Sequence, residues 1–118
     1  MSRLPAFTEE QEQLRHYVRR FMGEVSAEAA VRVQMQSAAG YDPAVWSAMA
    51  TKLGLQAIVI PERFGGQGYG SVELGIVLEE MGRALYCGPY LSSVGLGAQL
   101  LLLSGDEILM QRHLPAIA

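Results

Sequence analysis

The sequence is poor in cysteine and histidine, and each shortage argues against a class of site. Its one cysteine, Cys87, cannot form an internal disulfide, so nothing requires an oxidising compartment and a cytoplasmic location is expected. The thiol is expected to be a small core side chain and not a nucleophile. The two histidines, His16 and His113, lie far apart, and neither has a cysteine at zinc-ligand spacing. We therefore expect neither a disulfide framework nor a metal site.

Long apolar runs and an excess of basic charge are also missing. Nine Lys and Arg against twelve Asp and Glu give a net charge of −3, with the basic residues scattered, so no nucleic-acid partner is expected. The longest apolar stretch, residues 94–103, is interrupted by polar and glycine residues and is far shorter than the ~20 residues that cross a bilayer. Residues 1–5 lead into a polar helix start, so no targeting segment and no membrane span are predicted.

Hydrophobic residues, by contrast, make up 50% of the 118 residues, and charged residues only 18%. A chain of this length is usually one domain and buries roughly two-thirds of its unfolded surface. We expect a single domain over residues 1–118, with apolar surface to spare for a partner.

The first helix is predicted to begin at a capping box, in which Thr8 and Gln11 satisfy each other's backbone amides. Apolar residues then recur at helical spacing as far as Val25, which leaves Arg15 and Arg19 for the outer surface. Residues 26–39 suit neither helix nor strand strongly, and a loop with possible helical turns is expected there.

A second helix is predicted from Asp42, a favoured N-cap, with Pro43 at the first helical position and Gly54 as the C-cap. Residues 57–60 give a weak strand signal. The next segment, 65–70, contains four glycines and invites comparison with a phosphate-binding loop. Its spacing fits neither Walker A nor G-x-G-x-x-G, so a structural turn is the favoured interpretation.

A third helix is predicted from Ser71 as N-cap, with Leu85 on its inner face. Glu79 and Arg83 are spaced for an (i, i+4) ion pair, and the adjacent Glu80 is expected on a solvated surface.

The segment from Tyr90 to Leu103 is apolar on every side and predicts a central buried helix. A C-cap is followed at once by an N-cap at Ser104, Gly105 and Asp106. A last short helix is expected after them, with Pro115 limiting its length. These patterns predict an all-α fold, an antiparallel bundle of about five helices with the glycine-rich loop between the second and third major helices.

No catalytic constellation can be named from the residues themselves. Ser92 and Ser93 are possible nucleophiles, but no base, orienting group or oxyanion donor accompanies them, and the start of a helix is their simpler role. No cofactor-binding or metal-ligating residue stands out either.

The order of these features resembles the N-terminal domain of the acyl-CoA dehydrogenase family from about Phe7 to Ala118. The most specific match is Ile-Pro-Glu-Arg-Phe-Gly-Gly-Gln-Gly at residues 60–68, which is similar to the family's Pro-Glu-x-Tyr-Gly-Gly-x-Gly turn. Phe64 stands where tyrosine is common. Further matching segments are residues 8–14, 46–55, 78–83, 104–106 and 111–115.

The resemblance implies a flavin-dependent enzyme that desaturates an acyl-CoA thioester and passes electrons to an electron-transfer partner. In the family, FAD lies mainly against a middle β-barrel and a C-terminal helical bundle, and the catalytic glutamate belongs to the bundle. Residues 1–118 match neither, so the chain alone is expected to hold no FAD and to be inactive. Its expected partners are those domains or another subunit, in a homo- or hetero-oligomer.

Domains of this kind help to wall the acyl pocket in the family. The resemblance places that wall at Tyr90, Ser92, Ser93, Leu96 and Gln99, with ordinary packing against residues 74–85 as the alternative. Residues 86–91 look like those of bacterial members that act on bulky or steroid-like acyl-CoAs, some of which pair two unlike subunits. A different class of function is also open, namely a non-catalytic truncated homologue that serves as an interaction or oligomerisation module.

Overall fold

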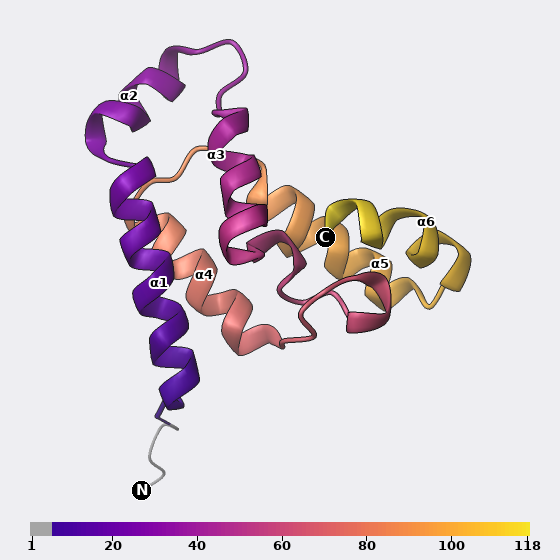
Figure 1. The fold of residues 1–118 in the computed structure, drawn as a ribbon. Helices are drawn as coiled ribbons and strands as arrows, with labels where there is room; N and C mark the ends of the chain where they lie inside the picture. Colours follow the sequence, from indigo (N-terminus) through magenta and orange to yellow (C-terminus); the bar gives the residue numbers. More distant parts are fainter. Residues whose placement is uncertain (1–5) are drawn as a thin grey trace, which may run out of the picture.

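The computed structural model describes residues 6–118; residues 1–5, where no targeting segment is predicted, lie outside the described part. Within it the secondary structure is entirely helical, which confirms the predicted all-α fold (Figure 1). The elements are α1 (Glu9–Val25), α2 (Glu28–Gln36), α3 (Pro43–Ala48), the π-helical η1 (Met49–Leu53), the short 3-10 turns η2 (Leu55–Ala57) and η3 (Glu62–Phe64), α4 (Ser71–Arg83), the π-helical η4 (Leu91–Ala98), α5 (Gln99–Ser104) and α6 (Glu107–Ile117).

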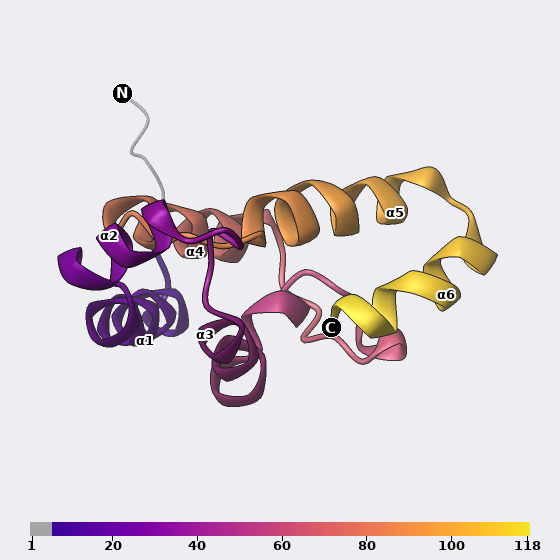
Figure 2. The same cartoon turned by 90° about the horizontal axis from the view of Figure 1, so that it is seen from above.

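Helix directions in the bundle are mixed. α1 and α4 lie side by side and run the same way, because Gln11 contacts Glu73 near their starts while Ser26 contacts Ala84 near their ends. α5 and α6 form a hairpin in which α6 runs back along α5 after a tight turn at Gly105 (Figure 2). Connections of a few residues therefore produce the antiparallel pair, whereas the longer path from α1 to α4 allows a parallel one.

Two apolar clusters hold these elements together. The main core joins α1, α4, η2 and the start of η4, and a smaller core lies beneath α6. The main core includes Val18, Met22, Met49, Leu55, Ile58, Val77, Met81, Tyr90 and Val94, and the smaller one Ile60, Phe64, Ala98, Met110 and Leu114.

The start of α1 is built as its sequence predicts. The Gln11 amide donates to the Thr8 hydroxyl at 3.2 Å, and the Thr8 amide donates to the Gln11 side chain at 2.9 Å. The prediction that Arg15 faces solvent is wrong, since only 14% of its side chain is exposed. It lies against α4, where Glu79 and Glu80 accept its hydrogen bonds.

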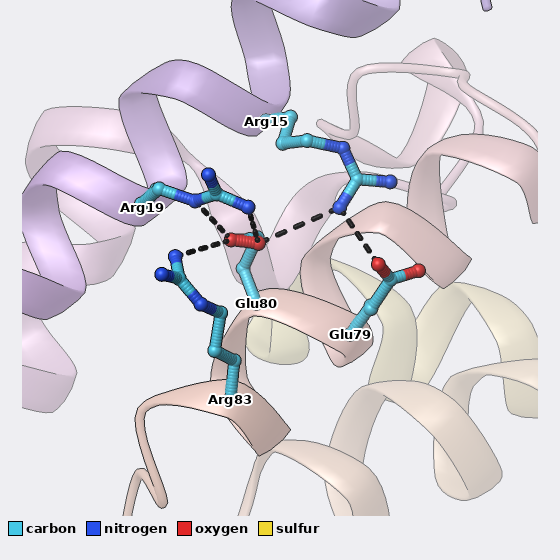
Figure 3. A network of polar contacts seen from close by, with 5 residues as sticks. All are labelled: Arg15, Arg19, Glu79, Glu80 and Arg83. Atoms are coloured by element: carbon cyan, nitrogen blue, oxygen red, sulfur yellow. Dashed lines mark hydrogen bonds and ion pairs between the residues drawn. The ribbon is translucent and has the colours of Figure 1, made fainter.

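Glu80 is the centre of an ionic cluster between α1 and α4 (Figure 3). Its side chain is 1% exposed, so the prediction of a solvated surface is wrong. Arg19 donates to both carboxylate oxygens, at 2.6 and 3.1 Å. Arg83 lies 3.7 Å from Glu80 and not beside Glu79, which replaces the expected (i, i+4) pair by an (i, i+3) one.

Residues 28–36 form the helix α2, where a loop was the expectation. None of its residues is buried, and no side chain caps its start. Only Ala30, Val31 and Gln34 are half-buried, so the inner side of this helix is narrow. The exposed pair of Glu28 and Arg32, 2.9 Å apart, supports the helix locally.

The second predicted helix is confirmed in its caps and is longer than α3 alone. Asp42 accepts from the Ala44 amide at 2.9 Å, η1 continues α3, and Gly54 ends it in the left-handed region. Residues 57–60 do not form a strand; they are buried, and their carbonyls accept from the amides of 67–69. The apolar run thus lies beneath the glycine-rich turn.

Two boundaries around α4 differ from prediction. Gly70 is the N-cap and Ser71 the first helical residue, with the Glu73 carboxylate accepting from the Gly70 amide at 3.3 Å. At the other end Leu85 is not on the inner face; it is 68% exposed and has a φ of 54°. The amides of Leu85 and Tyr86 donate back to Gly82 and Met81, so Leu85 occupies the position of a helix stop where glycine is usual.

The predicted central buried helix, residues 90–103, is buried on one side only. Val94 and Ala98 are fully buried, while Leu96, Leu100 and Leu103 are 62%, 71% and 83% exposed. The predicted caps at Gly105 and Asp106 are confirmed. Cys87 is expected in the core and is half-buried. α6 is expected to end at Pro115 and continues through it to Ile117.

Candidate functional site

The glycine-rich turn uses its own backbone amides. Those of residues 65–69 donate to carbonyls of Glu62, Pro61, Ala57, Ile60 and Ile58 at 2.9–3.1 Å, and that of Gly70 to the Glu73 carboxylate. A phosphate-binding loop needs amides that are free to point at the anion. Since every amide from 65 to 70 already has an acceptor, the turn is structural, as its spacing predicts.

Close packing explains why this turn is rich in glycine. Gly65 and Gly68 have φ of 87° and 70°, a region that other residues adopt only with strain. At Gly66 a Cβ atom would overlap the carbonyl of Ile60. Between these glycines the Gln67 side-chain amide donates to the carbonyls of Leu53 and Gly54, at 3.2 and 3.0 Å, and so secures the end of η1.

The predicted pocket residues coincide with an unusual backbone segment. Ser92, Ser93 and Leu96 lie within η4, and Tyr90 and Gln99 are the residues that flank it. Eight π-helical residues in succession are rare, and π-helical turns occur frequently at functional sites. The five residues that the resemblance names thus lie in this segment or directly beside it.

The side chains of these five residues point in different directions. Tyr90 is buried, and its hydroxyl donates to the Leu55 carbonyl at 2.7 Å. Burial raises the pKa of Tyr90, so the hydroxyl stays a donor. The Ser92 hydroxyl donates to the Pro89 carbonyl at 3.1 Å and caps no helix, Leu96 is exposed, and Gln99 is half-buried. No single cavity of the described chain gathers all five.

Ser93 alone of the five lines the cavity between η4–α5 and α6, which has a volume of about 590 Å³. Trp46 and His113 also line it, although neither is among the predicted pocket residues. No sequence signal could have joined these residues, because they come from α3, η4 and α6. The other lining residues are Gly97, Leu100, Leu101, Ala116 and Ile117.

This cavity is not a nucleophilic centre in the described chain. No hydrogen bond joins Ser93 to His113, and no carboxylate orients the imidazole. Nucleophilic catalysis by serine requires both contacts. Throughout residues 6–118, moreover, no three His, Cys, Asp or Glu side chains are grouped as a metal site would need. This surface can give a pocket its shape and can exclude water. No described side chain along it is placed to transfer a proton.

A second hollow, of about 670 Å³, lies between the start of α1, the end of η1 and the glycine-rich turn. It contains none of the predicted pocket residues. Its wall mixes charges of both signs with aromatic rings, from Glu10, Lys52, Glu73, Tyr17 and Tyr69. The exposed apolar face on η4 and α5 is therefore the better candidate for an acyl chain, because it combines apolar surface with the π-helical backbone.

No helix within residues 6–118 has both the length and the apolar character needed to span a bilayer.

Comparisons with known proteins show which family the chain resembles in sequence and fold. Residues 8–118 match the family model described as acyl-CoA dehydrogenase, N-terminal domain. Acyl-CoA dehydrogenase IpdE2 of Mycolicibacterium smegmatis is 41% identical over 86 residues, which cover 73% of this chain and 28% of that protein. The probable acyl-CoA dehydrogenase YngJ of Bacillus subtilis is 32% identical over 115 residues, covering 94% and 29% respectively.

Two solved structures contain a similar fold. A chain of the ChsE4-ChsE5 complex from Mycobacterium tuberculosis has a TM-score of 0.84 at 28% identity, over 95% of this chain and 30% of that one. A chain from a variant of the Tcur3481-Tcur3483 steroid ACAD has a TM-score of 0.81 at 27% identity, over 92% and 29%. The 118 residues thus span less than a third of the length of each of these proteins.

Proposed function

Since the chain belongs to the acyl-CoA dehydrogenase family, whose N-terminal domain it matches, we propose that residues 1–118 wall one side of the acyl pocket in such a dehydrogenase. The whole enzyme would form an α,β double bond in an acyl-CoA thioester. The observation that carries the proposal is the π-helical η4, which coincides with the predicted wall and presents exposed leucine side chains.

The wall's contribution is shape and the exclusion of water. Leu96 and Leu100, 62% and 71% exposed, lie four residues apart and offer apolar surface to a chain lying along the helix. Burying an exposed leucine fully is worth about 1.5–3 kcal/mol, which is enough to select among acyl chains. Small side chains beside them, such as Ser92, leave room for a wide substrate.

FAD supplies the hydride acceptor in this family, and the glycine-rich turn does not fit it. A flavin pyrophosphate would need free amides, and those of residues 65–70 are occupied. We therefore expect FAD to be held by other parts of the enzyme, and we assign no step of the chemistry to these residues.

The proposed partners are the rest of the dehydrogenase or a second subunit. Leu96, Leu100 and Leu103 on one helix form more exposed apolar surface than a domain on its own would be expected to leave to water. One of the similar structures is a complex of two named proteins, ChsE4 and ChsE5, which supports assembly with an unlike subunit.

A bulky acyl group is the substrate class that we propose. The sequence of residues 86–91 suggests it, and one of the similar structures is described as a steroid ACAD. Activity on branched or steroid thioesters with little on butyryl-CoA is the expected result. The reverse preference would contradict the bulky substrate but not the family.

Reconstitution tests the function itself. The purified chain is mixed with the barrel and C-terminal domains of its dehydrogenase, or with a partner subunit, and flavin absorbance is followed after an acyl-CoA is added. We expect bleaching in the mixture and none with the chain alone. If the chain binds its partner and the mixture still shows no bleaching, the interaction-module function replaces the enzymatic one.

Side-chain variants then test the wall. Leu96→Phe should lower kcat/KM for bulky thioesters about tenfold or more by overpacking the pocket. Val72→Phe is the matched control, because Val72 is also exposed, at 51%, but lies on the first turn of α4. Equal effects of the two variants would contradict a pocket at η4.

A further inference from the structure

We propose that Tyr90 is a positioning residue that fixes η4 against the core and so sets the position of the acyl-pocket wall. This inference rests on the proposed function and concerns a buried contact that no part of the proposal above uses. Gly97 has the corresponding role at the other end of η4.

A hydrogen bond from Tyr90 holds the start of η4. Tyr90 is 1% exposed, and its hydroxyl donates to the Leu55 carbonyl at 2.7 Å. Leu55 begins residues 55–60, all of which are buried. The Ile58 amide reaches the same carbonyl at a longer 3.4 Å. The bond to Tyr90 therefore joins η4 to a part of the core that has little freedom to move.

The backbone at the end of η4 is closely packed at Gly97. A Cβ atom on Gly97 would lie 3.1 Å from the Ser92 carbonyl oxygen, five residues earlier. That carbonyl lies close because the turn is π-helical, and a side chain at Gly97 would press against it. Glycine at this position thus avoids a shift of the Ser92 carbonyl by a few tenths of an ångström.

The π-helical register of η4 sets the direction in which the wall residues point. Each residue of an α-helix advances by about 100° around the axis, so loss of one π-helical insertion would rotate one end of the segment by about that amount. Ser92, Ser93 and Leu96 lie between Tyr90 and Gly97 and would turn relative to α5. Leu96 would then face a different direction relative to Tyr90 and the core.

The test is Tyr90→Phe in the assembled dehydrogenase, with Tyr86→Phe as the matched control. Both variants remove one buried hydroxyl, but within residues 6–118 the Tyr86 hydroxyl makes no hydrogen bond. For Tyr90→Phe we expect KM for bulky acyl-CoAs to rise about tenfold and kcat to change less than twofold. The KM for butyryl-CoA and the kinetics of Tyr86→Phe should stay near those of the unmodified enzyme.

Several results would overturn the proposal. Equal kinetic changes in the two tyrosine variants, or a uniform loss of kcat on every thioester, would leave Tyr90 with a purely structural role. If Tyr90→Phe does not fold, Gly97→Ala decides, because it alters the same segment without removing the hydroxyl. Unchanged selectivity in Gly97→Ala would refute the positioning role.

The same experiment separates this inference from the proposed function. If Leu96→Phe changes selectivity while Tyr90→Phe and Gly97→Ala do not, the pocket wall stands and the positioning role fails. If Leu96→Phe has no effect on any thioester, the pocket wall itself is contradicted.

Discussion

Replacing Glu80 by glutamine tests the ionic cluster between α1 and α4. The Glu80 side chain is 1% exposed and lies within 4 Å of three guanidinium groups, those of Arg15, Arg19 and Arg83. Glu80→Gln keeps the shape of the side chain and removes its charge. The guanidinium groups then lose the carboxylate that they share.

The size of the effect follows from how much of the cluster is buried. Removing one partner of a buried ion pair costs about 3–5 kcal/mol. Here Arg19 and Arg83 are 52% and 62% exposed and recover hydration, so only Arg15, 14% exposed, is left poorly solvated. We therefore expect Glu80→Gln to lower the free energy of unfolding by about 2–3 kcal/mol, or Tm by about 8–12 °C.

Urea unfolding followed by circular dichroism measures the change, and Glu79→Gln is its control. Glu79 is the neighbouring acid and also accepts from Arg15, but its side chain is 67% exposed. An exposed pair contributes at most about 1 kcal/mol. Equal destabilisation by the two variants would refute the argument, since burial of Glu80 would then not matter.

The pH dependence supplies a second check. The hydrogen bond from Arg19 is the main reason that the pKa of Glu80 lies below its ordinary value of 4.5. A lowered native pKa contributes stability that is fully present above the ordinary value and is lost as the pH falls through the native one. The difference between Glu80→Gln and the unmodified chain should therefore be largest near neutral pH and shrink below about 4.5. A constant difference would mean that shape and not charge is responsible.

Three further outcomes are expected. Leu85→Gly should raise the free energy of unfolding by about 1 kcal/mol in urea, because it relieves the φ of 54° and gives up little buried surface; a loss would show that Leu85 packs. Gly66→Ala should lower the free energy of unfolding by at least about 3 kcal/mol, because the new Cβ atom would meet the Ile60 carbonyl. Gly75→Ala has open space in the middle of α4 and should raise it by up to about 1 kcal/mol. Similar values for the two variants would contradict the close packing of the turn. Burial raises the pKa of Tyr86 to about 12, so a pH titration of phenolate absorbance should show a step near pH 12 that Tyr86→Phe lacks. The free energy of unfolding should fall as the pH rises above the ordinary tyrosine pKa of 10.

The features that could be predicted from sequence depend on neighbours within a few residues. Thr8, Asp42 and Asp106 cap helices because each side chain reaches an amide two or three positions further on. Gly54 and Gly105 end helices because the left-handed region is open to glycine. The resemblance adds five wall residues, which lie in or beside the π-helical η4, and their place in an acyl pocket stays a prediction.

The errors share a cause, which is that burial depends on segments distant in the chain. Glu80 reads as a surface acid until α1 brings Arg15 and Arg19 across it, from more than 60 residues away. The signal for α2 is weak because none of its residues is fully buried and only Ala30, Val31 and Gln34 are half-buried.

What the sequence by itself determined is therefore the all-α class, the family and the caps at Thr8, Asp42, Gly54, Gly105 and Asp106. The tertiary structure decided which apolar residues are core and which are surface. It left one side of residues 90–103 without a neighbour, so the leucines expected in the core lie on the outside. The physical reason is that apolar composition drives burial without specifying the partner, and within residues 6–118 Leu96, Leu100 and Leu103 stay exposed.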